Sequence, residues 1–187
     1  MSELRCISKL KVKSGSICGH VFENKAVGVK RDMFLTIRID FLPIKYDGEN
    51  WECSLDSNWI PFNKRGSWQG IADIDFSDSS IIESNQTTFY FMYHRECNNV
   101  TTEVSYLDKN LFQVTLGALV ENESPLKLDA VIPFTGFSIA RDGFFPKPDS
   151  TKNAIDIASE FIDVKSFHEP SFENRVYSFE PKYHCKN

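Results

Sequence analysis

The sequence predicts a mainly β protein, an antiparallel β-sandwich or barrel-like sheet with one C-terminal amphipathic α-helix. Apolar and polar residues alternate with period two in several short stretches, which places one set of side chains on each face of a strand. Turn residues separate these stretches about every 10–15 residues, a spacing typical of hairpins. The chain of 187 residues also holds 16 Phe, and aromatic residues favour strands. Together these observations favour antiparallel pairing over a βαβ layout.

The first half of the chain supplies the clearest strand. In Met33–Phe41 the odd-numbered residues are apolar, and most of the residues between them are polar. Residues 4–12 and 17–22 are predicted as two shorter strands, with Ser14-Gly15-Ser16 between them. Asp47-Gly48 is a turn signal, and residues 33–46 and 51–55 on either side of it are predicted to form a hairpin.

Further strands are predicted along the chain as far as residue 132. Alternation over Trp68–Phe76 predicts a strand that presents Asp73 and Asp75 on its outward face. Phe89, Phe91 and Tyr93 share one face of the next strand. Another hairpin pairs residues 100–106 with 111–120 across Asp108-Lys109-Asn110, and residues 126–132 continue the series. No helix is predicted before residue 140.

One segment has helical periodicity. Ala154, Ile155, Ala158, Phe161 and Ile162 follow the spacing of an amphipathic helix, which is predicted over about 149–164. Asp149 or Ser150 is expected to cap its first turn, and Pro170 lies beyond its end. Residues 176–179 are predicted as a last short strand. With no internal repeat or linker, residues 1–187 are expected to form a single domain.

Composition indicates a cytoplasmic location. The N-terminus lacks the apolar run of a signal peptide, and no stretch approaches the ~18 apolar residues that a membrane span needs. Five scattered Cys, an odd number, are typical of a reducing compartment with free thiols. We therefore expect no contact with a membrane. The oligomeric state is left open.

Charge is spread unevenly along the chain. The net charge is −5, but residues 1–31 hold seven Lys or Arg against two Glu, so the remainder is strongly acidic. A chain of this balance lacks the clustered cations that bind nucleic-acid phosphates. It is better suited to steer a protein partner with a basic surface toward its acidic face.

The candidate site combines acidic and aromatic residues. Asp73, Asp75 and Asp78, followed by Glu83, lie in a segment from 66 to 94 that contains no Lys or Arg. A solvated strand face, a docking surface for a partner, and a calcium or magnesium site are three interpretations of these carboxylates. The spacing excludes an EF-hand loop. Trp68, Phe144 and Phe145 are the aromatic residues expected to anchor a partner, although burial under the predicted helix is the favoured interpretation of Phe144 and Phe145.

Cys/His pairs are the other residues with chemical potential. Cys18-x-His20, His94-x-x-Cys97 and His184-Cys185 could supply zinc ligands or a thiol nucleophile, but none has knuckle spacing or a flanking catalytic motif. Chance adjacency and inert buried thiols are favoured. We therefore expect no catalytic residue, no metal and no cofactor.

The leading functional hypothesis is a non-enzymatic protein-binding module. In size, acidity and lack of a leader the chain resembles small cytosolic inhibitors, such as immunity proteins that neutralise a cognate toxin. That resemblance implies inhibition by occlusion, with the carboxylates facing a basic cleft. One alternative is a β-sandwich that binds a carbohydrate or lipid, with Trp51, Trp59 and Trp68 as stacking residues. The other is a metal-dependent hydrolase that uses Asp73, Asp75 and Asp78.

Overall fold

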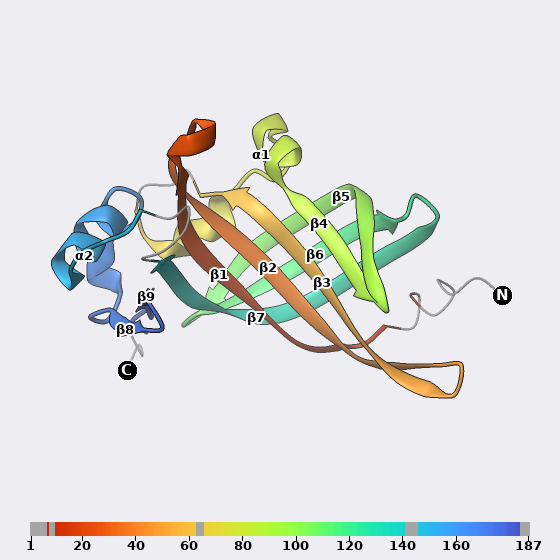
Figure 1. Cartoon of the computed structure of the whole chain (residues 1–187). Coiled ribbons are helices and arrows are strands. Elements are labelled where there is room, and N and C mark those ends of the chain that lie inside the picture. Colours follow the sequence, from red (N-terminus) through yellow and green to blue (C-terminus); the bar gives the residue numbers. More distant parts are fainter. Residues whose placement is uncertain (1–6, 8–9, 63–65, 141–145, 184–187) are drawn as a thin grey trace.

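Figure 1 shows the computed structural model, which describes residues 7, 10–62, 66–140 and 146–183. It is 62% strand and contains a closed barrel of seven strands, which confirms the mainly β, barrel-like class. The strands are β1 (Val12–Asn24), β2 (Val29–Tyr46), β3 (Glu49–Pro61), β4 (Gln86–Phe91), β5 (Tyr93–Asp108), β6 (Leu111–Val120), β7 (Ser124–Ala140), β8 (Ser171–Glu173) and β9 (Val176–Phe179). The helical segments are η2 (Lys25–Val27), η3 (Trp68–Asp73), α1 (Ser79–Ser84), α2 (Thr151–Ser159) and η4 (Val164–Ser166).

The barrel closes through a parallel pair. Successive strands from β1 to β7 pair antiparallel, as the sequence predicts. A series of seven such strands ends in the direction in which it began, so β1 and β7 meet parallel, from Ile17↔Phe134 to His20↔Ser138. Gly136 lies at this junction with φ 113°, and a Cβ there would collide with the carbonyl oxygen of Phe179. Glycine is therefore required where β9 packs against β7.

Apolar side chains fill the barrel interior. The inward set of β2 that the alternation predicts is buried, and the facing strands contribute residues such as Leu55, Phe89 and Leu116, each 0% exposed. Because the interior is occupied by its own side chains, the barrel is a packed core rather than a chamber for a ligand.

Both predicted hairpins are confirmed. β2 and β3 pair across Asp47 and Gly48, whose positive φ values of 50° and 85° fit the two-residue turn that Asp-Gly favours. β5 and β6 pair across Lys109, which also has a positive φ of 49°. The final strand, β9, spans the predicted residues 176–179.

The predicted break near the N-terminus is wrong. β1 runs without interruption through Ser14-Gly15-Ser16. A Cβ at Gly15 would lie 2.7 Å from the carbonyl oxygen of Arg38, so this glycine permits close approach of two strands rather than a turn. Most of the predicted strand 4–12 lies outside the described residues.

The predicted strand over 68–76 is also wrong. Trp68–Asp73 forms the 3-10 helix η3, and Asp75 follows it in a loop. The buried residues of η3, Trp68 and Ile71, are three positions apart, which matches the three residues per turn of a 3-10 helix. The alternation of apolar and polar residues over Trp68–Phe76 favoured a strand, although the three-residue interval between Trp68 and Ile71 is the spacing that the core uses. With η2 and α1 present as well, the expectation of no helix before residue 140 fails.

The predicted single strand through Phe89, Phe91 and Tyr93 is in fact a tight reversal. β4 ends at Phe91, Met92 takes a positive φ of 65°, and β5 begins at Tyr93. Tyr93 therefore lies on the next strand, and it is exposed while Phe89 and Phe91 are buried.

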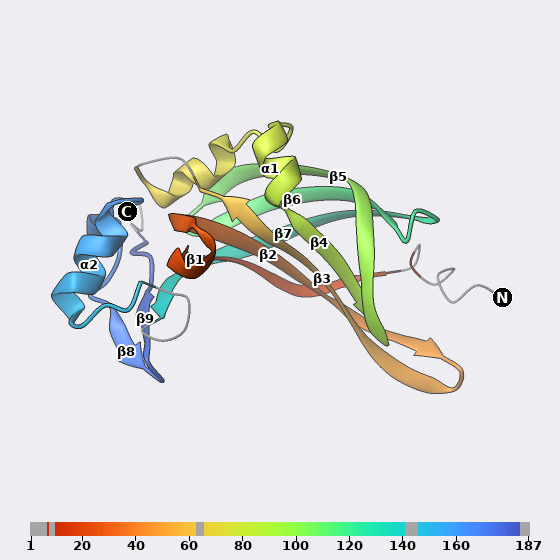
Figure 2. The ribbon, with the colours of Figure 1, turned by 45° about the horizontal axis from the view of Figure 1, so that its top comes forward.

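The C-terminal helix is confirmed but is shorter than predicted. Ser150 caps α2 by accepting a hydrogen bond from the Asn153 backbone N–H at 3.2 Å. The helix ends at Ser159, and Ile162 then bridges to Gly66 while the Asp163 N–H donates to the Gly66 carbonyl oxygen. Figures 1 and 2 show α2, β8 and β9 beyond one end of the barrel, opposite the projecting β2–β3 hairpin.

Candidate functional site

The barrel wall has a short seam between β4 and β5. These strands pair only from Phe91↔Tyr93 to Thr88↔Glu96, whereas β5 continues to Asp108 and pairs with β6 as far as its end. A bulge lies in β5 between Asn98 and Thr101, and Asn99 has a positive φ of 52°. A bulge bends its strand and increases its twist, which accounts for the divergence of β5 from β4. In the described part of the chain, no strand pairs with this edge of β5 beyond Glu96.

A groove follows the open edge. It consists of two adjoining hollows of about 730 and 500 Å³, which share Phe76, Ile82, Val100 and Thr102 as lining residues. One wall is β5 from Glu96 to Val104, and the other is the segment between β3 and β4, including α1. We call this feature the β5 groove. The volume of each hollow is within the usual range of ligand-binding sites.

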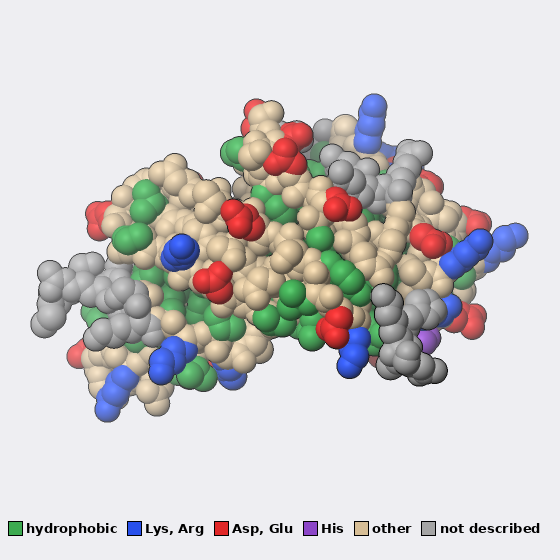
Figure 3. Space-filling view, turned by 180° about the vertical axis from the view of Figure 1, so that it is seen from behind, with side chains coloured by type: hydrophobic (Ala, Val, Ile, Leu, Met, Phe, Trp, Pro, Cys, Tyr) green, Lys and Arg blue, Asp and Glu red, His purple; other side chains and the backbone are tan. Residues whose placement is uncertain are grey.

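The β5 groove has an apolar centre and acidic margins. Ile74, Phe76, Ile82, Val100 and Val104 supply the apolar surface, and the Ile82 side chain is 60% exposed. The charged lining residues are Asp75, Glu96 and Glu103, and neither hollow is lined by a described Lys or Arg. Figure 3 shows acidic side chains gathered on the projection at the top of the molecule, where α1 lies in Figure 1.

The four predicted carboxylates lie on this same segment. Asp73 ends η3, Asp75 and Asp78 occupy the following loop, and Glu83 lies in α1; all four are exposed. Only Asp75 lines the groove, and its Oδ1 atom accepts hydrogen bonds from the N–H and hydroxyl of Ser77 at 3.0 and 2.6 Å. The other three flank it. The acids therefore form a flank of the β5 groove rather than the predicted strand face.

The predicted aromatic anchors are not at the groove surface. Trp68 is 1% exposed and stacks on Phe134 with ring centroids 5.6 Å apart, so it is a core residue and not an anchor for a partner. The inward 3-10 turn of η3 explains this correction. Phe144 and Phe145 lie outside the described residues. Ile82, which is exposed, and Phe76, which is half-buried, line both hollows of the groove.

Thr87 and Thr102 line the barrel side of the groove, and their buried hydroxyls differ in their partners. The hydroxyls of Ser57 and Thr87 lie 2.9 Å apart, and the Ser57 hydroxyl donates to Oδ1 of Asn85 at 2.9 Å. By contrast, Thr102 is 9% exposed and its Oγ1 has no hydrogen-bond partner among the described residues. Burial also raises the pKa of the Cys97 thiol to about 11, so this lining thiol stays protonated and is a poor nucleophile.

Sequence reasoning missed the β5 side of the groove. Asn98-Asn99 inside an otherwise strand-like stretch is a signal for a bulge, because asparagine tolerates positive φ. The adjacent pair Ile81-Ile82 also signals a short helix with one buried and one exposed apolar residue. Which strand edge would be left unpaired depends on long-range pairing, which these local signals do not contain.

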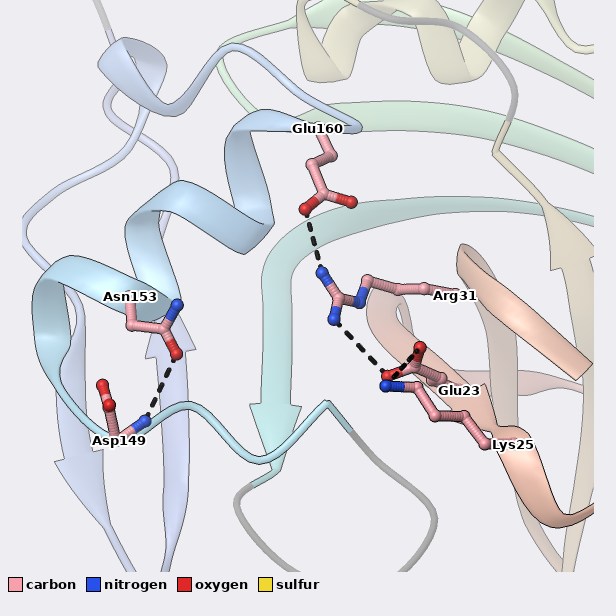
Figure 4. Close-up of polar contacts among 6 residues, drawn as sticks. All are labelled: Glu23, Lys25, Arg31, Asp149, Asn153 and Glu160. Carbon is pink, nitrogen blue, oxygen red and sulfur yellow. Dashed lines mark hydrogen bonds and ion pairs between the residues drawn. The ribbon is translucent and has the colours of Figure 1, made fainter.

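A second cleft of about 680 Å³ separates α2 from the barrel rim. Arg31 on β2 bridges the two sides, with Nη1 2.9 Å from Glu160 and Nη2 3.5 Å from Glu23, and Lys25 lies 3.6 Å from Glu23 (Figure 4). The described lining holds equal numbers of basic and acidic side chains, so they balance one another. This cleft shows no preference for a ligand of either charge and is best explained as an ionic attachment of α2.

The remaining sequence candidates are dispersed. Trp59 packs with His20, Phe22 and Phe34 on the outside of β1–β3, whereas Trp51 is half-buried elsewhere on β3. Burial lowers the pKa of His20 and raises that of Cys18, which favours the neutral form of both. Cys97 is buried while His94 is exposed, and His184 and Cys185 lie outside the described residues. Among the residues described, no group of three His, Cys, Asp or Glu, Asp73, Asp75 and Asp78 included, is arranged to hold a metal ion.

Comparisons with protein-family models, curated proteins and solved structures gave no match. No helix in the described ranges is both long enough and apolar enough to cross a membrane.

Proposed function

We propose that this chain is a non-enzymatic protein-binding module whose β5 groove docks a basic segment of a protein partner. The observation that carries the proposal is the composition of the groove, an exposed apolar centre between Asp75, Glu96 and Glu103 with no described cation lining it. Interfaces combine a desolvated apolar core with a charged rim, and the rim sets orientation and association rate.

Its most concrete form is a cytoplasmic inhibitor of the immunity type that acts by occlusion. Asp73, Asp78 and Glu83 flank the groove and face solvent, so they add to the negative potential that a basic active-site cleft would meet. Ile82, 60% exposed at the centre, is the side chain best placed to be buried by such a partner. The packed barrel serves as the rigid support for this surface.

The test is co-purification from the native host with tagged protein at low and high salt. A variant D73K/D75N/D78N/E83K weakens the acidic flank while retaining an amide oxygen at the loop positions 75 and 78. The matched control, E49K/E52Q/E169K/E173Q, changes net charge equally at exposed sites outside the groove. We expect a basic protein that binds the wild type and the control at about 0.05 M salt but is lost at about 0.5 M salt, where charge interactions are screened. It should be absent with the groove variant, and equal capture by both variants would contradict the proposal.

A further inference from the structure

The β5 groove shows how its occupant would bind. We infer that the partner segment is an extended, basic peptide that adds as a strand to the open edge of β5. This inference rests on the proposed function. Edge addition requires unpaired backbone groups along a strand and room beside them for alternate side chains. The structure provides both between Asn98 and Val104.

One side of the backbone of this segment has no partner strand among the described residues. Thr101–Val104 pairs with Gly117–Val114 of β6. On the opposite side no strand of the described chain pairs with it, and no backbone hydrogen bond joins it to η3, α1 or β4. Since a β-strand directs alternate N–H and C=O groups to its two sides, half of these groups point toward the groove.

Two hollows of about 730 and 500 Å³ lie along this edge, where the added strand would sit. Successive side chains of an inserted strand would point alternately toward the barrel and toward solvent. Phe76, Ile82, Val100 and Val104 provide an apolar surface for one set of side chains, while Asp75 and Glu103 lie where Lys or Arg would be favoured. The predicted occupant therefore alternates small apolar with basic residues.

Thr102 gives an independent indication of a missing partner. Its side chain is buried, it lines both hollows, and Oγ1 has no hydrogen-bond partner among the described residues. An unpaired buried hydroxyl is unfavourable, whereas the nearby hydroxyls of Ser57 and Thr87 are bonded to each other. A backbone or side-chain group of an inserted strand would satisfy Thr102.

The experiment uses the full chain and a synthetic peptide of about nine residues that alternates Lys with Val, long enough to span the edge from Asn98 to Val104. Two N-methylated versions carry methyl groups on alternate amides, one on the Lys set and the other on the Val set. Strand addition uses only one of these sets, so one methylated peptide should lose about tenfold or more in affinity while the other binds nearly as the parent does. Binding by the parent should also be lost with I82K but kept with V131K, which places a lysine at an exposed apolar position of β7.

The outcomes separate this inference from the proposed function. Equal affinity of the two methylated peptides, or no binding of the parent peptide, overturns strand addition. Should the native partner still be captured and be lost with the acidic-flank variant, the proposed function stands without this mode. If no charge-dependent partner is captured but the two methylated peptides differ in affinity as expected, the edge of β5 binds peptides and the proposed function is contradicted.

Discussion

Strands β2 and β5 perform different tasks in the same barrel. β2 is paired on both sides, with β1 and β3, and its inward residues from Met33 to Phe41 are at most 1% exposed. β5 pairs with β4 over Tyr93–Glu96 and with β6 from Cys97 to Asp108, and beyond Glu96 its other edge borders an apolar and acidic groove. We therefore expect the stability of the barrel to depend more on β2, which is paired on both sides, than on the β5 residues beside the groove.

The largest expected effect is the contrast between core truncations in the two regions. Ile37→Ala in β2 removes a side chain that is 1% exposed and should cost about 2–5 kcal/mol of unfolding free energy. Val100→Ala, at a half-buried groove position, should cost less than about 1 kcal/mol because little surface is lost from the core. Urea denaturation of both variants measures the difference. A Val100 variant as unstable as the Ile37 variant would show that the groove is structural.

The paired end of the seam depends on a buried cation. Arg95 is 2% exposed, its Nη1 lies 2.7 Å from Glu121, and its guanidinium lies 4.0 Å from the centroid of the Tyr93 ring. Glu121→Gln should lower the free energy of unfolding by about 2–3 kcal/mol because it removes the negative charge 2.7 Å from a buried guanidinium. Arg95→Met should cost less, since the remaining carboxylate is partly exposed and can be hydrated. Chemical denaturation ranks the two variants, and the reverse order would contradict this explanation.

Two threonines on the barrel side of the groove form a matched pair. Thr87→Val removes a hydroxyl bonded to Ser57 and should lower the free energy of unfolding by about 1 kcal/mol. Thr102→Val removes an unpaired hydroxyl and should be neutral or slightly stabilising. Thermal denaturation distinguishes them. If Thr102→Val proved the more destabilising, Oγ1 would have a partner in the free protein and the indication of a missing one would fail.

The smallest expected effect is the pH dependence of stability that His20 contributes on the outside of β1. Burial lowers the folded-state pKa of His20, so the unfolded chain binds more protons below its ordinary pKa of about 6.5. The free energy of unfolding should therefore fall as pH decreases from about 6.5 toward the lowered folded value, and the contribution is constant above that window. A His20→Gln variant should lack this part of the pH dependence in denaturation at pH 5 to 7.5. An unchanged slope would contradict the lowered pKa.

Local sequence signals predict strand β2 and its hairpin better than they predict where the pairing of β4 with β5 ends. Alternation in Met33–Phe41 and the Asp47-Gly48 turn predict β2 and its hairpin because both depend on neighbouring residues. The same alternation misleads at Trp68–Phe76, where the three-residue spacing of Trp68 and Ile71 is the one that the core uses. The acidic character of residues 66–94 points correctly to an exposed flank, but the groove depends on where β4 leaves β5. The divergence of β4 from β5 depends on the bulge at Asn98–Thr101 and on strand pairing across the barrel. The alternation of apolar and polar residues predicts neither of these.

Backbone amide hydrogen exchange, resolved by residue, tests the open edge most directly. In the free protein, alternate amides of Thr101–Val104 should exchange rapidly, while the others, bonded to β6, exchange slowly. The amides of Leu35–Ile39 in β2 point toward β1 or toward β3, and both sets should exchange slowly. Adding the alternating Lys/Val peptide should slow the rapid set alone. Uniform protection of Thr101–Val104 in the free protein would mean that this edge is already paired, and the binding role assigned to β5 would then be wrong.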